Sequence, residues 1–437
     1  MRVAWVTAFS PRSGIAEFSR QLTPAIALHA DVDIWTPDDP PLLESKLPIV
    51  RFGADRQLEE TLGDYDIVVY NMGNTVHPHR TIHQLSQRHP GIVILHDHVL
   101  HPMFVAAWLR DGGFTDSMYI SRMAAYYGET GACVARESLS GARPRVWESD
   151  EVVEYPLVEQ ALQRALGAVT HSQVHAQYIR EHWFGPVRAL QNPTYRDALA
   201  TGMLAGPAPA ARSDGRIQLT TIGHVTANKQ CHRVIELLAE DHELAARTHY
   251  TIVGPLDDGN AYAAELAALA RSLPQVSVEI LGWRGELELD RLMAATDVFI
   301  NLRHPTIESG SASLTLELAY GRPILCFDAG AFGELPPDAL ARVPAPDFDA
   351  ARSELKRLVS DADYRRRLGE NARHLAGERS EAAYAQGFIE FVAEAQRCAP
   401  ALTLLDRVAT ELGAMRADPL LPVFDTIAND FGRVLSL

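Results

Sequence analysis

The chain is poor in cysteine, with only four in 437 residues. These four lie far apart and form no C-x-x-C pair, so the sequence predicts neither a disulfide framework nor a zinc site. They are Cys133, Cys231, Cys326 and Cys398. This usage is typical of a reducing compartment.

Long hydrophobic runs are also missing. No stretch approaches the roughly 20 apolar residues that a membrane span requires, and the first apolar stretch, Val3 to Phe9, lacks a basic leader and a cleavage site. We therefore expect a cytoplasmic protein, and we leave open a peripheral contact with the inner face of the membrane.

Positive charge is scarce. Lys and Arg total 40 against 56 Asp and Glu, which gives a formal net charge of −16. Such a charge repels a phosphate backbone, so we expect no nucleic-acid partner. An anionic ligand must instead be held by a few local cations and backbone N–H groups.

Three common catalytic motifs are absent. The sequence has no G-x-x-x-x-G-K-[ST] phosphate loop, no G-x-G-x-x-G turn after its first apolar run and no G-x-S-x-G elbow. Kinase, dehydrogenase and serine hydrolase functions therefore lose their main support.

Short apolar runs alternate with helical patterns, which predicts parallel sheets covered by helices on both faces. A stretch rich in Ala, Gly and Pro between Tyr195 and Arg216 predicts a linker. The predicted fold class is α/β, with two doubly wound, Rossmann-like domains facing across a cleft. We expect an N-terminal domain over 1–200, a C-terminal domain over 201–379 and a helical extension over 380–437.

The extension carries an apolar stripe within Ser380 to Ala395. Its members are spaced as one helix face, at Tyr384, Phe388, Phe391 and Val392. Further apolar residues continue toward the C-terminus, at Leu402, Leu405, Val408, Leu412, Phe424, Ile427, Phe431 and Val434. We expect this extension to pack on the N-terminal domain or on a second subunit, which would make a homo-oligomer.

The most informative segment runs from His304 to Pro323 and follows a predicted strand. Its loop and helix start are made of small residues, namely Ser309, Gly310, Ser311, Ala312 and Ser313. We expect backbone N–H groups here to bind an anion, with Glu308 and Glu317 accepting hydrogen bonds from sugar hydroxyls. An ordinary connection with solvated glutamates is the alternative.

A second segment, Thr221 to Gln230, also joins a predicted strand to a predicted helix. It contains Gly223, His224 and Lys229. We expect Lys229 to stand on an exposed loop and to neutralise a diphosphate leaving group. A solvated surface lysine is the alternative.

Polar residues follow two strands of the N-terminal half. His96 and Asp97 follow the strand Ile92–Leu95, and Asn74 and His77 follow a neighbouring strand. These side chains should share one rim of a sheet. No signature such as H-E-x-x-H is present, so we favour a polar cluster lining a sugar pocket over a metal site. Ordinary loop hydrogen bonds are the alternative for Asn74 and His77.

Together these segments resemble the family 4 retaining glycosyltransferases of GT-B fold. The order and spacing of the motifs carry the likeness through most of the chain. They are Ser13-Gly14-Ile15-Ala16, Tyr70-Asn71-Met72-Gly73-Asn74, His96-Asp97, His171-Ser172, Gly223 with Lys229, Asn301-Leu302-Arg303 and Glu308 to Pro323. The resemblance implies an acceptor-side domain over 1–200 and a nucleotide-sugar-binding domain over 201–379.

Residue roles are also implied by the resemblance. Gly14 would let its loop approach the reacting centre, and His96 would lie beside the donor sugar. Lys229 would bind the diphosphate, Glu317 would hold the ribose and Glu308 would face the donor sugar. The catalytic residues would be His96, Lys229 and Glu308. The other nucleotide-sugar contacts would be Gly223, His224, Ser309, Gly310, Ser311, Ala312 and Ser313, and the acceptor or pocket rim would be Asn74, His77, Asp97 and Arg303.

Two positions depart from the family pattern. His224 stands where the family usually has Arg, so phosphate binding is expected to be weaker or to depend on pH. Eight residues separate Glu308 from Glu317, where the family usually has seven, and Ser309 occupies the place expected for the first glutamate.

The resemblance implies a retaining, hexosyl-type glycosyltransferase that needs no metal or other cofactor. It would move a sugar from a nucleotide-diphosphate sugar to a glycan, lipid-linked or other hydroxyl acceptor, in the synthesis of cell-surface polysaccharide or glycoconjugate. Two alternatives stay open. One is a nucleotide-sugar epimerase or phosphorylase on the same scaffold, and the other is a non-catalytic sugar-nucleotide-binding protein.

Overall fold

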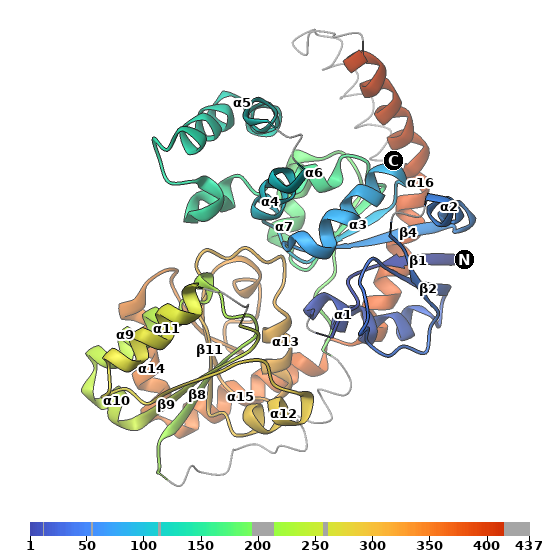
Figure 1. Ribbon diagram of the computed structural model, residues 1–437. Coiled ribbons are helices and arrows are strands. Elements are labelled where there is room, and N and C mark those ends of the chain that lie inside the picture. The colour runs from blue at the N-terminus through green and yellow to red at the C-terminus, as the bar shows by residue number, and fades with distance from the viewer. Residues whose placement is uncertain (12, 54–55, 112–114, 195–213, 257–260, 415–437) are drawn as a thin grey trace. The chain divides into compact units, whose positions relative to one another are not determined.

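The computed structural model describes residues 1–11, 13–53, 56–111, 115–194, 214–256 and 261–414. The chain divides into two compact units (Figure 1). Unit 1 comprises Met1–Gln191, Ile307–Gly310 and Ala382–Leu437, and unit 2 comprises Asn192–Thr306 and Ser311–Glu381. Most of the predicted linker and the apolar positions from Phe424 onward lie outside the described residues.

Unit 1 contains a seven-stranded parallel sheet in the order β3-β2-β1-β4-β5-β6-β7. Its strands are β1 (Arg2–Val6), β2 (Asp31–Thr36), β3 (Ile49–Arg51), β4 (Ile67–Met72), β5 (Ile92–Leu95), β6 (Gly167–Thr170) and β7 (Val187–Ala189). The predicted parallel sheet is thus present, including the strand expected at Ile92–Leu95, and the three-residue strands β3 and β7 form its two edges.

Helices cover both faces of this sheet because successive strand residues point to opposite sides (Figure 1). Trp5 of β1 packs in a cluster with residues of α1 (Gly14–Ile26) and α16 (Glu381–Ala414), whereas its neighbour Val6 belongs to a cluster on the other face. The remaining helices of unit 1 are α2 (Arg56–Glu60), η1 (Thr61–Asp64), α3 (Val76–Arg88), α4 (His101–Asp111), α5 (Asp116–Ser140), η2 (Val146–Glu148), η3 (Asp150–Glu154), α6 (Val158–Leu162) and α7 (Gln173–His182).

Unit 2 repeats the plan with a six-stranded parallel sheet in the order β10-β9-β8-β11-β12-β13. Its strands are β8 (Ile217–Ile222), β9 (Thr248–Val253), β10 (Val278–Leu281), β11 (Val298–Asn301), β12 (Ile324–Phe327) and β13 (Ala341–Val343). Its helices are η4 (Ala227–Lys229), α9 (Cys231–Glu240), α10 (His242–Arg247), α11 (Ala261–Ser272), α12 (Glu286–Ala294), α13 (Ala312–Ala319), η5 (Gly330–Phe332), α14 (Phe348–Ser360) and α15 (Ala362–Gly377). Two apolar clusters, one on each side of the sheet, form its core.

Helix α16 returns the chain to unit 1. Tyr384, Phe388, Phe391 and Val392 are each at most 4% exposed and lie in one cluster with Trp5 and Phe18. The segment Ile307–Gly310 also belongs to unit 1, although the predicted domain 201–379 included it. No helix among the described residues is both long enough and apolar enough to cross a membrane.

Each sheet has a point where the strand order reverses, between β1 and β4 in unit 1 and between β8 and β11 in unit 2. Ligands of open α/β sheets bind beyond the carboxyl ends of the strands at such points. The loops that leave these four strands therefore mark the region of each unit in which a site is expected.

Candidate functional site

A buried polar cluster in unit 2 surrounds the carboxylate of Glu317. This residue lies on α13 and is 1% exposed. Asn301, the last residue of β11, donates a hydrogen bond of 2.8 Å from Nδ2 to Glu317 Oε2. The second oxygen, Oε1, is buried without a hydrogen-bond partner. A carboxylate oxygen in this state is an acceptor ready for a hydroxyl group.

Arg303 organises the rest of the cluster. Its Nη2 donates to the hydroxyls of Ser311 at 3.0 Å and Ser313 at 2.8 Å, and its Nε donates to Asn301 Oδ1 at 2.8 Å. The residue is 5% exposed. Arg303 therefore helps to hold the start of α13 inside unit 2, and its place on an acceptor or pocket rim stays a prediction.

Lys229 belongs to the same region. It is 7% exposed, and its Nζ donates to the carbonyl of Ile222 at the end of β8. The expectation of an exposed loop lysine is wrong, because η4 folds the side chain back over the strand end. Gly223 makes this possible: it has φ of 94°, and a Cβ there would lie 2.6 Å from Lys229 Nζ.

Burial sets the charge state of Glu317. Loss of solvation raises its pKa from 4.5 to about 7, while the Asn301 hydrogen bond and the charges of Arg303 and Lys229 oppose the rise. The carboxyl group is thus poised near neutrality. Functional sites often contain such shifted groups.

The other predicted contacts of unit 2 are partly buried in this cluster and partly exposed. Ser311 caps α13 by accepting from Leu314 N at 3.1 Å, and Ser313 lies within the buried cluster. His224 and Ala312 are exposed. The role of His224 at a phosphate stays a prediction.

The segment Ile307–Gly310 packs inside unit 1 through Ser309. The Ser309 hydroxyl donates to Leu95 O at 2.5 Å and accepts from His171 N at 3.0 Å. Its backbone N–H donates to His96 O at 3.0 Å. That N–H group is therefore already used, which corrects the expectation that it serves a bound anion. The preceding residue, Glu308, forms an isolated antiparallel β-bridge with Asp97 through the backbone.

His96 has both ring nitrogens engaged within unit 1. Its Nε2 lies 3.0 Å from Asn71 Oδ1, and its Nδ1 lies 3.2 Å from His171 Nε2. A hydrogen bond from this ring to a donor sugar would therefore require one of these contacts to break. The role of His96 beside a donor sugar stays a prediction.

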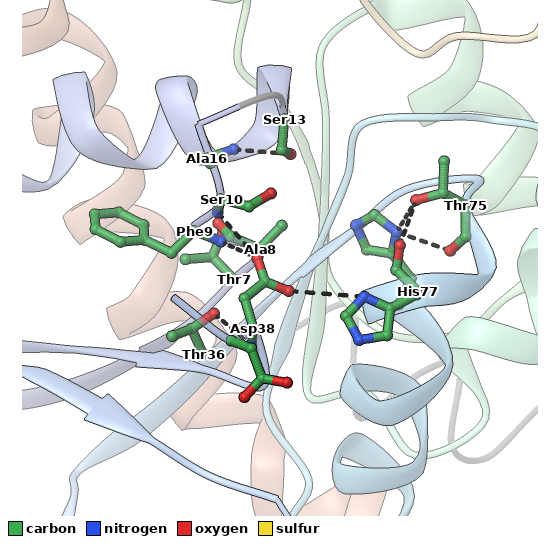
Figure 2. Close-up of polar contacts among 12 residues, drawn as sticks. Thr7, Ala8, Phe9, Ser10, Ser13, Ala16, Thr36, Asp38, Thr75 and His77 are labelled. Atoms are coloured by element: carbon green, nitrogen blue, oxygen red, sulfur yellow. Dashed lines mark hydrogen bonds and ion pairs between the residues drawn. The ribbon is translucent and has the colours of Figure 1, made fainter. Parts of the chain in front are cut away.

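The loop after β1 is held by a buried carboxylate (Figure 2). Asp38 Oδ2 accepts from Phe9 N at 2.7 Å and Ser10 N at 3.0 Å, and its Oδ1 lies 3.9 Å from Nδ1 of the exposed His77. Ser13 caps α1 by accepting from Ala16 N at 3.2 Å. Gly14 opens the helix, and a Cβ there would meet no atom within 4 Å.

Asn74 is occupied by local structure. Its N–H donates to Asp97 Oδ2 at 2.7 Å, and its Oδ1 accepts from Met103 N at 3.2 Å. These contacts favour the loop-stabilising alternative for Asn74. His77, in contrast, is exposed beside Asp38, and its place on an acceptor or pocket rim stays a prediction.

Sequence reasoning missed four residues of these regions. Asn301, Asn71 and Asp38 were not assigned roles, although Asn301 and Asn71 directly follow apolar residues of a strand, which is the available signal, and Asp38 comes two residues after a strand ends. The fourth is Trp283, which is 50% exposed and lies two residues beyond the carboxyl end of β10. An exposed indole is unusual, and its position at the carboxyl edge of the sheet, where ligands bind, makes Trp283 a candidate ligand contact.

Comparison with known proteins identifies the fold. Residues 207–375 match the family model described as glycosyl transferases group 1. No curated protein matches the sequence of the chain. Among solved structures, WaaG, a glycosyltransferase involved in lipopolysaccharide biosynthesis, is 15% identical with a TM-score of 0.60, over 89% of this chain and 99% of that chain.

Two further structures are similar to the same extent. Anabaena HepE in complex with UDP and glucose is 16% identical with a TM-score of 0.60, over 90% of this chain and 99% of that one. Sucrose-phosphate synthase from Thermosynechococcus elongatus is 15% identical with a TM-score of 0.62, over 90% of this chain and 98% of that one. The chain therefore has the fold of the GT-B glycosyltransferases, and its residues 207–375 match the model of the group 1 glycosyl transferases.

Proposed function

We propose that this protein is a retaining glycosyltransferase that moves a hexosyl group from a nucleotide-diphosphate sugar to a hydroxyl acceptor. The observation that carries the proposal is the buried Glu317 carboxyl, whose Oε1 has no hydrogen-bond partner and lies in the family-matched domain. A ribose hydroxyl supplies the donor that this oxygen needs. The structures of Anabaena HepE with UDP and with UDP-glucose support a nucleotide sugar as the donor class.

Charge on the leaving group is the second element of the proposal. During transfer the bond between the anomeric carbon and the phosphate oxygen breaks, and the diphosphate gains negative charge. The acceptor oxygen forms the new bond, and its proton passes to the leaving diphosphate. Lys229, buried beside the β8 carboxyl end, stabilises the charge that develops.

The nucleobase is the third element. Trp283 follows β10 in the same sheet whose reversal point holds Gly223 and Asn301. Its half-exposed indole offers a flat apolar face on which a base stacks. We assign the base to this face.

The acceptor belongs to unit 1 in this proposal. The pair of Asp38 and the exposed His77 beside the loop after β1 offers polar groups for a polyhydroxylated acceptor (Figure 2). We propose a glycan or lipid-linked acceptor, a cytoplasmic location and a role in cell-surface polysaccharide or glycoconjugate synthesis. WaaG, with its part in lipopolysaccharide biosynthesis, supports this choice.

The test is a panel of nucleotide-diphosphate sugars incubated with the protein, first alone and then with glycan and lipid-linked acceptors. We expect release of nucleoside diphosphate that depends on the acceptor, and a product whose anomeric configuration by NMR matches that of the donor. An altered sugar without acceptor would indicate an epimerase. Inverted configuration would overturn the retaining mechanism, and tight nucleotide binding without transfer would indicate a non-catalytic protein.

A further inference from the structure

Unit 1 contains a partly buried chain of hydrogen bonds that joins the carboxyl ends of five strands of its sheet, β1, β4, β5, β6 and β7. Asn71 Nδ2 donates to Val6 O at 3.2 Å, and Asn71 Oδ1 lies 3.0 Å from His96 Nε2. His96 Nδ1 lies 3.2 Å from His171 Nε2, and His171 Nδ1 lies 3.0 Å from Leu190 O. The chain thus begins and ends on a backbone carbonyl, and each carbonyl can only accept.

This chain is one proton short when both imidazoles are neutral. Four hydrogen bonds require four hydrogens, but the amide offers one donor along the chain and each neutral imidazole also offers one. If the Asn71 amide is flipped or the imidazole tautomers are exchanged, a different contact lacks its hydrogen, and the total stays one hydrogen short. Adding one proton to the two rings supplies the fourth hydrogen and completes every bond.

We propose that His96 and His171 together bind one proton more readily than the fully buried His101 does, and that the protonated pair places a positive charge at the carboxyl edge of the unit 1 sheet. Both rings follow strand ends, His96 after β5 and His171 after β6. Ser309 fixes them there, because it bonds the His96 carbonyl and the His171 N–H group. The charged pair suits an anionic group of a ligand bound at this edge. The proposal does not depend on the glycosyltransferase assignment.

The neutral ring of His101, in the same unit, has a hydrogen available for each of its hydrogen bonds. Its Nδ1 lies 2.6 Å from Tyr155 O, and its Nε2 lies 2.8 Å from the Tyr119 hydroxyl. The neutral ring donates to the carbonyl and accepts from the hydroxyl, so no proton is missing. His101 is 0% exposed and serves as a fully buried reference, whereas His171 is 4% exposed and His96 is partly exposed.

Burial opposes the added charge. It lowers the pKa of His96 well below 6.5 and that of His171 to about 4, and neighbouring histidines act in the same direction. The titratable groups that face the pair are His79 from α3, His175 from α7, Tyr384 from α16 and Glu308 from the Ile307–Gly310 segment. The charge of Glu308 raises the pKa of His175. Burial also lowers the pKa of His101 to about 4. The pair differs from His101 in its missing hydrogen bond and in the partial exposure of His96. A missing bond of this kind corresponds to about one to two pKa units.

The experiment is a pH titration of the full-length protein with ¹⁵N-labelled histidine, in which NMR reports the protonation of each ring nitrogen. Signals are assigned from single His→Gln variants. We expect the pair to take up one proton with an apparent pKa at least one unit above that of His101. If the pair titrates with His101 or below it, or if both rings stay neutral until the protein unfolds in acid, the proposal is overturned.

Variants separate the proton count from simple burial. Asn71→Leu removes the acceptor at one end, so two neutral rings then satisfy the remaining bonds and the apparent pKa of the pair should fall by at least one unit. His171→Phe removes two contacts at the other end of the chain, so that a neutral His96 and the Asn71 amide supply every remaining hydrogen. This variant replaces Asn71→Leu if that variant does not fold. Tyr119→Phe is the control, because it removes a hydroxyl at His101 without creating a deficit, and should leave the pair unchanged. An unchanged pKa in both Asn71→Leu and His171→Phe would also overturn the proposal.

Discussion

Glu317 shows how one buried carboxyl links stability to pH. Its pKa is about 7 in the folded protein and 4.5 in the reference state. Between these values the folded protein holds a proton that the unfolded chain has released, so the free energy of unfolding falls as pH rises through this window. The loss amounts to about 3 kcal/mol by pH 8.

Glu317→Gln should remove this dependence, because the amide does not titrate. We expect the wild-type protein to lose about 2–3 kcal/mol relative to the variant between pH 5 and pH 8. Urea unfolding at the two pH values measures the difference. An equal difference between the two proteins at both values would show that the carboxyl is not held neutral by burial.

Lys229 should affect chemistry more than binding. Lys229→Met keeps much of the apolar stem and removes the charge that stabilises a leaving diphosphate. We expect turnover at saturating donor to fall about a hundred- to a thousandfold. Lys46→Met, at an exposed lysine of unit 1, is the control and should leave turnover unchanged. Normal turnover in Lys229→Met would remove Lys229 from the reacting centre.

Trp283 should report directly on the nucleobase. If the base stacks on the indole, nucleoside diphosphate should quench part of the protein's tryptophan fluorescence, and Trp283→Phe should lose that part while still binding. Trp283→Ala should weaken binding by about 1–3 kcal/mol. Calorimetry gives the affinities. Unchanged affinity and quenching in Trp283→Ala would place the base elsewhere.

At the scale of elements, α16 is a structural member of unit 1. Phe388 and Phe391 are 0% exposed and lie in the cluster that holds Trp5 of β1. Phe388→Ala should therefore destabilise unit 1 by about 3–5 kcal/mol, through lost burial and the cavity left behind.

The same helix supplies the control for this measurement. Leu404 is 53% exposed, so Leu404→Ala should change stability by less than about 0.5 kcal/mol. Thermal or urea unfolding of the two variants makes the comparison. A similar loss of stability in both variants would mean that α16 does not stabilise unit 1 specifically through the helix face that contains Phe388.

At the scale of the whole molecule, the two units differ in how the chain builds them. Unit 2 is nearly continuous in sequence, whereas unit 1 needs α16 and the Ile307–Gly310 segment in addition to Met1–Gln191. A fragment of residues 192–381 should therefore fold and bind nucleoside diphosphate, while residues 1–191 should aggregate because the cluster lacks Phe388 and Phe391.

Expression of the two fragments, with thermal unfolding and calorimetry of the soluble product, tests this asymmetry. Addition of residues 382–437 to the first fragment through a flexible linker should recover solubility. A soluble, cooperatively unfolding fragment 1–191 would contradict the assignment of α16 to the core of unit 1.

The sequence was sufficient to predict the central strands of both sheets and the apolar stripe of α16. These features are local, because a buried strand or a helix face repeats its apolar residues at a fixed period. The loop at Gly223 was predicted because a small residue directly follows an apolar run, and the loop at Ser309 to Ser313 because a run of small residues precedes a helical pattern. The edge strands β3, β7 and β13 have three residues each, too few to show a period.

Only the tertiary structure decided how polar groups pair across the fold. Lys229 is buried because the β8 carbonyl of Ile222 accepts from it, and Arg303 is buried because Ser311 and Ser313 accept from it. Ser309 joins unit 1 through the backbones of Leu95 and His171, which lie 214 and 138 residues away in sequence. Such contacts leave no periodic trace, because each depends on groups that only folding brings within hydrogen-bond distance. The sequence therefore determined where strands, loops and reactive residue types occur, and the folded arrangement determined which of those residues are buried, paired and charged.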